Sequence, residues 1–92
     1  MFVYMSLHYP KEEYKTQLRD SMERFKKSLE NCDGFIEGYT LVDEKTGLFV
    51  RMIKWKSKNH MKKNVHLGIE TIKNDNYEKW ELKPPHTFYL ND

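Results

Sequence analysis

Leu48-Phe49-Val50-Arg51-Met52-Ile53-Lys54-Trp55 carries apolar side chains on both alternations of an extended chain. Successive side chains of a β-strand point to opposite faces. A strand with water on one face therefore alternates apolar with polar residues, whereas a strand that is apolar on both faces is covered on both. A chain of 92 residues has room for about two helices, which can cover one face of a sheet. The uncovered face predicts a homodimer with a sheet-walled interior.

Length and composition predict a single globular domain over residues 1–92. The chain is 38% hydrophobic and 33% charged, and its net charge of +2 gives no reason to expect a nucleic acid or a membrane as partner. The single cysteine, Cys32, excludes an internal disulfide framework and is typical of a reducing compartment. The N-terminal residues lack a basic leader followed by a long apolar run, and no segment has membrane-spanning length. We therefore expect a cytoplasmic protein.

The hydrophobic pattern predicts the element order β-α-β-β-α-β. The expected elements are a strand at 2–9, a helix at 11–31, strands at 35–42 and 48–55 joined by a hairpin turn at 43–47, a helix that starts after Ser57, and a final strand at 86–90. This order is typical of a ferredoxin-like α+β fold. In that fold, both helices cover one face of a four-stranded antiparallel sheet. Two such sheets would close into a β-barrel in the dimer.

Both helices carry apolar residues at helical spacing. The first stripe consists of Tyr14, Leu18, Met22, Phe25 and Leu29, and the second of Met61, Val65, Ile69 and Ile72. Gly34, in Asn31-Cys32-Asp33-Gly34, is expected to terminate the first helix, and Gly68 is a candidate interruption of the second. Residues 74–76 are expected to end the second helix before a short turn. Whether residues 77–85 close over the cavity as a lid is left open.

The first strand gives an assignment of the two faces of the predicted sheet. If Val3, Met5 and Leu7 face the helices, the other set of that strand lies on the open side. The open set would then be Phe2, Tyr4, Ser6 and His8, joined by Phe49, Arg51, Ile53 and Trp55 and, from the second strand, by Tyr39 and Leu41. Aromatic and aliphatic walls with a few polar groups are typical of a small-molecule pocket. The alternative is a dimer core in which the polar groups pair with backbone or water.

Several short motifs resemble the antibiotic biosynthesis monooxygenase-like family of dimeric α/β barrels. They are the Asp33-Gly34-Phe35 step, Trp55-Lys56-Ser57 at a strand end, His66 in the second helix, and Tyr77-Glu78-Lys79-Trp80. The resemblance covers Phe2 to Leu90. The chain differs from the usual sequence of the family at two positions. Asp33 occupies a position where proline is common, and Lys56 occupies one where glutamate is common.

The resemblance implies a homodimer with a cavity between sheet and helices in each protomer. Family members include cofactor-free oxygenases of polycyclic phenols and quinols, haem-degrading oxygenases, and proteins without known activity. The haem-degrading branch uses an asparagine on the first strand, a tryptophan in the second helix and a later axial histidine. Here the first strand offers Ser6 and His8, residues 73–76 contain no histidine, and Trp55 ends a strand. We therefore disfavour haem and expect no cofactor.

Cofactor-free oxygenation of a small aromatic or quinol substrate needs a base, a dry cavity and a group that stabilises an oxyanion. His66 is the first candidate base and His8 the second, and Arg51 is the candidate for holding the anion. The candidate substrate-binding residues are Tyr4, Tyr39, Phe49, Ile53 and Trp55. An alternative for His66 is a helix-surface or capping role.

A second hypothesis is a non-catalytic dimer that binds a small hydrophobic molecule. The two hypotheses differ in whether a titratable residue points into the pocket. Metal binding is not expected, because His60 and His66 are not spaced to share a helical face. RNA binding is a minor alternative, since the lysines around 54–63 read as a solvated helix face and the third strand lacks the glycine-aromatic signature of RNA-binding sheets.

Overall fold

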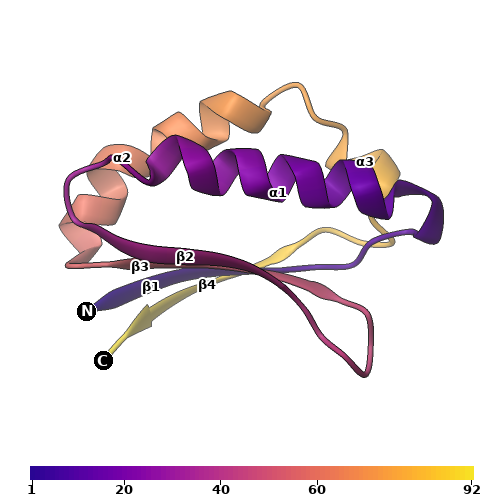
Figure 1. Cartoon of the computed structure of the whole chain (residues 1–92), viewed down its shortest axis with the longest axis horizontal. Helices are drawn as coiled ribbons and strands as arrows, with labels where there is room; N and C mark the ends of the chain where they lie inside the picture. The colour runs from indigo at the N-terminus through magenta and orange to yellow at the C-terminus, as the bar shows by residue number, and fades with distance from the viewer.

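The computed structural model describes all residues, 1–92, and confirms the predicted ferredoxin-like α+β fold. Its elements are β1 (Phe2–His8), the 3-10 turn η1 (Glu12–Tyr14), α1 (Lys15–Leu29), β2 (Phe35–Val42), β3 (Phe49–Trp55), α2 (Lys58–Ile72), α3 (Tyr77–Trp80) and β4 (His86–Asn91). The four strands form an antiparallel sheet in the order β2-β3-β1-β4. Figure 1 shows α1 and α2 lying side by side over one face of this sheet.

The first helix is shorter than the sequence predicts. The segment after Pro10 forms η1, and the regular helix begins only at Lys15. The apolar stripe is otherwise confirmed, since Leu18, Met22, Phe25 and Leu29 are buried. Tyr14 belongs to η1 and is only half-buried.

The second helix begins as predicted and runs through Gly68 without interruption. The Ser57 side chain accepts a hydrogen bond from the backbone N–H of His60 and caps the helix. Gly68 is buried where α2 meets α1, and a Cβ atom there would stand 2.7 Å from the Phe25 ring. This glycine therefore sets how closely the two helices approach. Val65 is only half-buried and Ile69 is 52% exposed, so part of the apolar stripe of α2 is uncovered.

The assignment of the two sheet faces from the sequence was wrong. The residues under the helices are Phe2, Tyr4, Ser6 and His8 of β1 and Phe49, Arg51, Ile53 and Trp55 of β3. Val3, Met5 and Leu7 lie on the outer face instead. The aromatic set lies inside because two helices leave a thick layer above the sheet, which large side chains fill at close-packed density.

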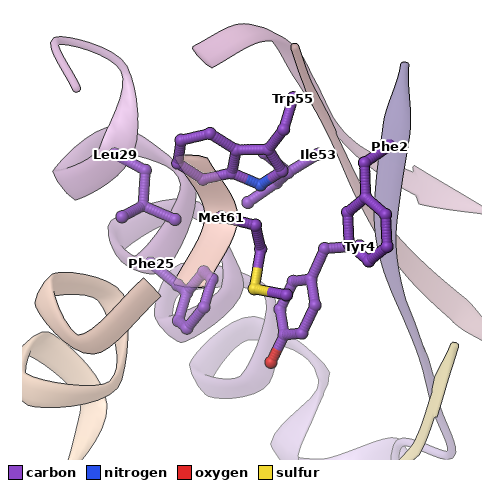
Figure 2. Close-up of a cluster of buried hydrophobic side chains, with 7 residues drawn as sticks. All are labelled: Phe2, Tyr4, Phe25, Leu29, Ile53, Trp55 and Met61. Atoms are coloured by element: carbon purple, nitrogen blue, oxygen red, sulfur yellow. The ribbon is translucent and has the colours of Figure 1, made fainter. Parts of the chain in front are cut away.

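The main core lies between the helices and the two central strands. Figure 2 shows its cluster, which consists of Phe2, Tyr4, Phe25, Leu29, Ile53, Trp55 and Met61. A smaller cluster of Leu18, Met22 and Phe49 continues the core toward α3. None of the helices combines the length and the hydropathy that crossing a bilayer requires.

Candidate active site

A row of polar side chains interrupts the core under the helices. On β1, the helix-facing residues change from aromatic to polar at Ser6 and His8, and Arg51 stands opposite Ser6 on β3. All three side chains are buried, with exposures of 1%, 1% and 4% respectively. Buried polar groups need partners or a function, because each unpaired group loses its hydration without replacement.

Two of these groups belong to a hydrogen-bonded chain with a carboxylate. His8 Nδ1 lies 2.9 Å from Glu81 Oε2, and His8 Nε2 lies 2.8 Å from Ser6 Oγ. The second carboxylate oxygen of Glu81 accepts a hydrogen bond from the Tyr9 backbone N–H at 2.7 Å. A carboxylate that accepts from Nδ1–H fixes the ring and leaves Nε2 free to take a proton through the hydroxyl. The chain can therefore act as an oriented general base.

Arg51 has no carboxylate partner. Its Nε and Nη1 atoms are buried without hydrogen-bond partners, and its Cζ lies 3.7 Å from the centre of the Phe25 ring. Burial lowers the pKa of Arg51, although a guanidinium still keeps its charge at neutral pH. Burial also raises the pKa of Tyr4 and of Tyr77, and the charge of Arg51 opposes that rise in both. The cation thus lies between two protonated phenols, and only the Tyr77 hydroxyl and the charge of Glu81 compensate it in part.

A second polar network fixes α3 to α1 above this row. Ser21 Oγ donates a hydrogen bond to Asp75 at 2.5 Å and lies 2.8 Å from Tyr77 Oη. Arg24 donates to the same carboxylate at 2.7 Å. The Tyr77 ring meets the His8 ring edge-on, with centres 5.6 Å apart. These contacts hold the start of the 77–85 segment over the polar end of the core.

Two clefts open near the polar row, but Ser6, His8 and Arg51 line neither of them. The first, here called the α2 cleft, has a volume of about 450 Å³ and is lined by Tyr4, Lys58, Met61, Lys62, Val65, Ile69 and Tyr89. The second, the α3 cleft, has a volume of about 340 Å³ and is lined by Tyr77, Glu78, Glu81, Leu82, Lys83, Pro84 and Pro85. The charge of Arg51 acts on Tyr4 of the first cleft and on Tyr77 and Glu81 of the second. Five of the seven residues that line the α2 cleft are hydrophobic, against two of seven in the α3 cleft, and walls of this kind suit an aromatic ring.

The structure brings together six of the eight residues proposed from the sequence and separates His66 and Tyr39. The six that share the face under the helices are Tyr4, His8, Phe49, Arg51, Ile53 and Trp55. His66 is exposed on α2, so its ranking as first candidate base is not supported. Tyr39 lies on the outer face, 39% exposed, and its hydroxyl donates to Glu37.

The remaining predicted wall residues are part of the core. Phe49, Ile53 and Trp55 are buried and line neither cleft. Sequence reasoning missed Glu81 and Tyr77 as site residues. The only signal of Glu81 was a carboxylate between Trp80 and Leu82 in a segment without clear periodicity, and Tyr77 appeared only as part of the Tyr77-Glu78-Lys79-Trp80 motif. No group of three or more histidine, cysteine, aspartate or glutamate side chains is placed to hold a metal ion.

Comparison with known proteins identifies the class of fold. No family model and no curated protein matches this chain. Among solved structures, the fold is shared with an antibiotic biosynthesis monooxygenase at 12% identity, with a TM-score of 0.79 and coverage of 100% of this chain and 98% of that one. A conserved protein from Methanosarcina mazei matches at 8% identity and a TM-score of 0.84, over 99% of this chain and 91% of that chain.

A third match was solved with a ligand. It is a monooxygenase from Streptomyces coelicolor in complex with nanaomycin D, at 10% identity and a TM-score of 0.74, over 99% of this chain and 86% of that chain. The resemblance predicted from the sequence is confirmed at the level of the fold, which is that of the antibiotic biosynthesis monooxygenases.

Proposed function

We propose that this protein is a cofactor-independent monooxygenase that acts on a small aromatic phenol or quinol. The observation that supports this proposal best is Arg51, a guanidinium that is 4% exposed and has two donor atoms without partners. Leaving a charged group buried and unpaired costs several kcal/mol in order of magnitude. A substrate phenolate beside Arg51 would satisfy those donors and remove most of that penalty.

The proposed reaction uses the polar row as a unit. The substrate ring would lie in the α2 cleft against Tyr4, a lining residue on which the charge of Arg51 acts. Arg51 and Ser6 face each other in register and do not line the cleft, so the phenol oxygen would have to pass the wall at Tyr4 to reach them. Ser6 takes the phenol proton as its own proton passes to His8 Nε2, while Glu81 holds the imidazole. The phenolate can then transfer electrons to dioxygen.

The stoichiometry needs no added reductant. A phenol oxidised to a quinone, or an anthrone methylene oxidised to a carbonyl, supplies four electrons to one molecule of dioxygen. One oxygen atom enters the substrate and the other leaves as water. The protein has to supply only a base, an anion-stabilising group and a cavity that excludes bulk water.

The test is oxygen uptake with a panel of anthrones and naphthols, using ¹⁸O₂ and mass spectrometry of the product. We expect one ¹⁸O atom in each product molecule. The variant His8→Phe should lower turnover about 10²–10⁴-fold, the range attributed to a general base. His66→Ala is the matched control and should retain the wild-type rate. Rates no faster than the enzyme-free oxidation for every compound would contradict the proposed activity.

A non-catalytic ligand-binding protein is the second candidate. It is favoured by one observation, which is that no histidine lines either cleft. The same panel separates the two candidates, because a binding protein would saturate with ligand while oxygen uptake stayed at the background rate.

We also propose that the protein is a homodimer formed through the outer face of the sheet. Tyr39, Met52, Met5 and Phe88 form a continuous row across that face, and Leu41 and Leu90 beside it are 47% and 42% exposed. The helices leave this face uncovered (Figure 1). Exposed apolar patches of this kind are typical of protein interfaces.

The variant Met52→Glu should convert a dimer into a monomer, because it places a charge in the centre of the proposed interface. Light scattering coupled to size-exclusion chromatography measures the change. Thr16→Glu, on the exposed surface of α1, is the control and should leave the mass unchanged. A wild-type chain that elutes as a monomer at all concentrations would rule out the interface.

A further inference from the structure

The mouth of the α2 cleft carries two lysines and no acid. Lys58 and Lys62 stand one helical turn apart on α2, and both line the cleft. Neither forms an ion pair with a carboxylate of this chain. The five other lining residues are tyrosine or aliphatic, so nothing in the wall neutralises the two ammonium groups.

Lys58 and Lys62 line the α2 cleft, whereas Arg51 lies behind its wall at Tyr4 and does not line it. Tyr4 belongs to the inner wall of the α2 cleft and lies beside Arg51, whereas Lys58 and Lys62 are exposed to solvent at the outer end. Apolar walls keep the local dielectric low and strengthen the positive potential between them. A neutral hydrocarbon would pack against the apolar walls but would bring no negative charge to neutralise this positive potential.

We propose that Lys58 and Lys62 select a ligand that bears an acidic substituent, a carboxylate or sulfonate, on its aromatic ring system. The ring fills the apolar part of the α2 cleft, and the acidic group projects to the two lysines. This inference rests on the site of the proposed function and narrows its substrate class to aromatic acids. It adds specificity-determining residues and leaves the roles of Arg51 and His8 unchanged.

The test uses two fluorescent probes with the same aromatic skeleton. 1-Anilinonaphthalene-8-sulfonate carries one negative charge, and N-phenyl-1-naphthylamine is its neutral counterpart. The wild-type protein should bind the sulfonate about tenfold more tightly than the neutral probe, since two partly desolvated ion pairs contribute somewhat more than 1 kcal/mol together. Raising the salt concentration should reduce this preference.

Three variants locate the effect. Lys58→Gln combined with Lys62→Gln should remove the preference for the sulfonate and leave the neutral probe within twofold. Lys56→Gln combined with Lys63→Gln removes two exposed lysines that do not line the cleft and should preserve the preference. Val65→Trp fills the cleft and should weaken both probes together.

Equal affinity for the two probes, or a preference that survives the Lys58 and Lys62 substitutions, would overturn this inference. Its failure differs from failure of the proposed function. A protein that prefers the sulfonate but consumes no oxygen keeps this inference and loses the monooxygenase. A protein that turns over neutral phenols without any charge preference keeps the proposed monooxygenase activity and loses the selective role of Lys58 and Lys62.

Discussion

Replacing Arg51 by methionine is expected to raise the free energy of unfolding by about 1–4 kcal/mol while it abolishes turnover. Exchanging a buried ion pair for apolar residues of similar volume is often neutral or stabilising by this amount, and the Arg51 exchange leaves Glu81 paired with His8. Here the guanidinium is 4% exposed, and two of its donor atoms lack partners. Its contact with the Phe25 ring, 3.7 Å away, offsets about 2 kcal/mol or more, because the contact is desolvated. We expect the desolvation penalty of several kcal/mol to exceed this contribution.

Urea unfolding at a fixed protein concentration measures the change, because oligomerisation makes the stability of such a protein concentration-dependent. Arg24→Met is the comparison, since that guanidinium pairs with Asp20 and Asp75 at the surface. Arg24→Met should be neutral or mildly destabilising. A loss of stability in the Arg51 variant would show that its charge is satisfied in the isolated protein, which would remove the main support for the proposed function.

Replacing Gly34 by alanine is expected to lower the free energy of unfolding by about 3 kcal/mol or more. Gly34 has a φ of +86°, a conformation that costs other residues about 1–2 kcal/mol. An added Cβ would also stand 2.2 Å from Cγ of His60, which is fixed by its contacts with the Ser57 cap. The clash adds to the backbone strain because neither partner is at a flexible chain end.

Gly47→Ala separates these two contributions. Gly47 has a φ of +76°, but a Cβ atom there meets nothing within 4 Å. It should therefore show only the backbone strain. The double variant Gly34→Ala with His60→Ala should recover the clash contribution and leave the strain, which a double-mutant cycle measures directly. Equal losses for Gly34→Ala and Gly47→Ala would contradict a packing role for Gly34.

The same glycine explains why two short motifs occur together in this chain. The carbonyl of Gly34 accepts a hydrogen bond from the Lys56 N–H at 2.8 Å, and the Phe35 and Trp55 rings meet edge-on. The step from α1 into β2 is thus bound to the step from β3 into α2. The contact could not be predicted from the sequence, because the Asp33-Gly34-Phe35 and Trp55-Lys56-Ser57 motifs are far apart in the chain, although each motif was recognised separately.

The elements themselves could be predicted well, because they depend on local pattern. The stripe on α1 and the Ser57 cap are properties of neighbouring residues, and both were confirmed. The start of α1 was missed, because the 3-10 turn before it satisfies the same hydrophobic spacing.

The candidate site was predicted only in part. His8 and Arg51 stood out as polar residues in apolar strands, and the structure places both under the helices. His66 was ranked first because of its position in a family motif, yet it is exposed. Glu81 joins the site from 73 residues away in the sequence, through a segment without any periodic pattern.

Local periodicity was thus sufficient to establish the number, type and order of the strands and helices, since it depends on residues a few positions apart. The orientation of the sheet could not be obtained in this way, because β1 and β3 are apolar on both alternations and either face could meet the helices. Side-chain volume determines which face of the sheet meets the helices, because the aromatic set fills the layer beneath α1 and α2. The polar row, the unpaired Arg51 and the two clefts follow from that choice.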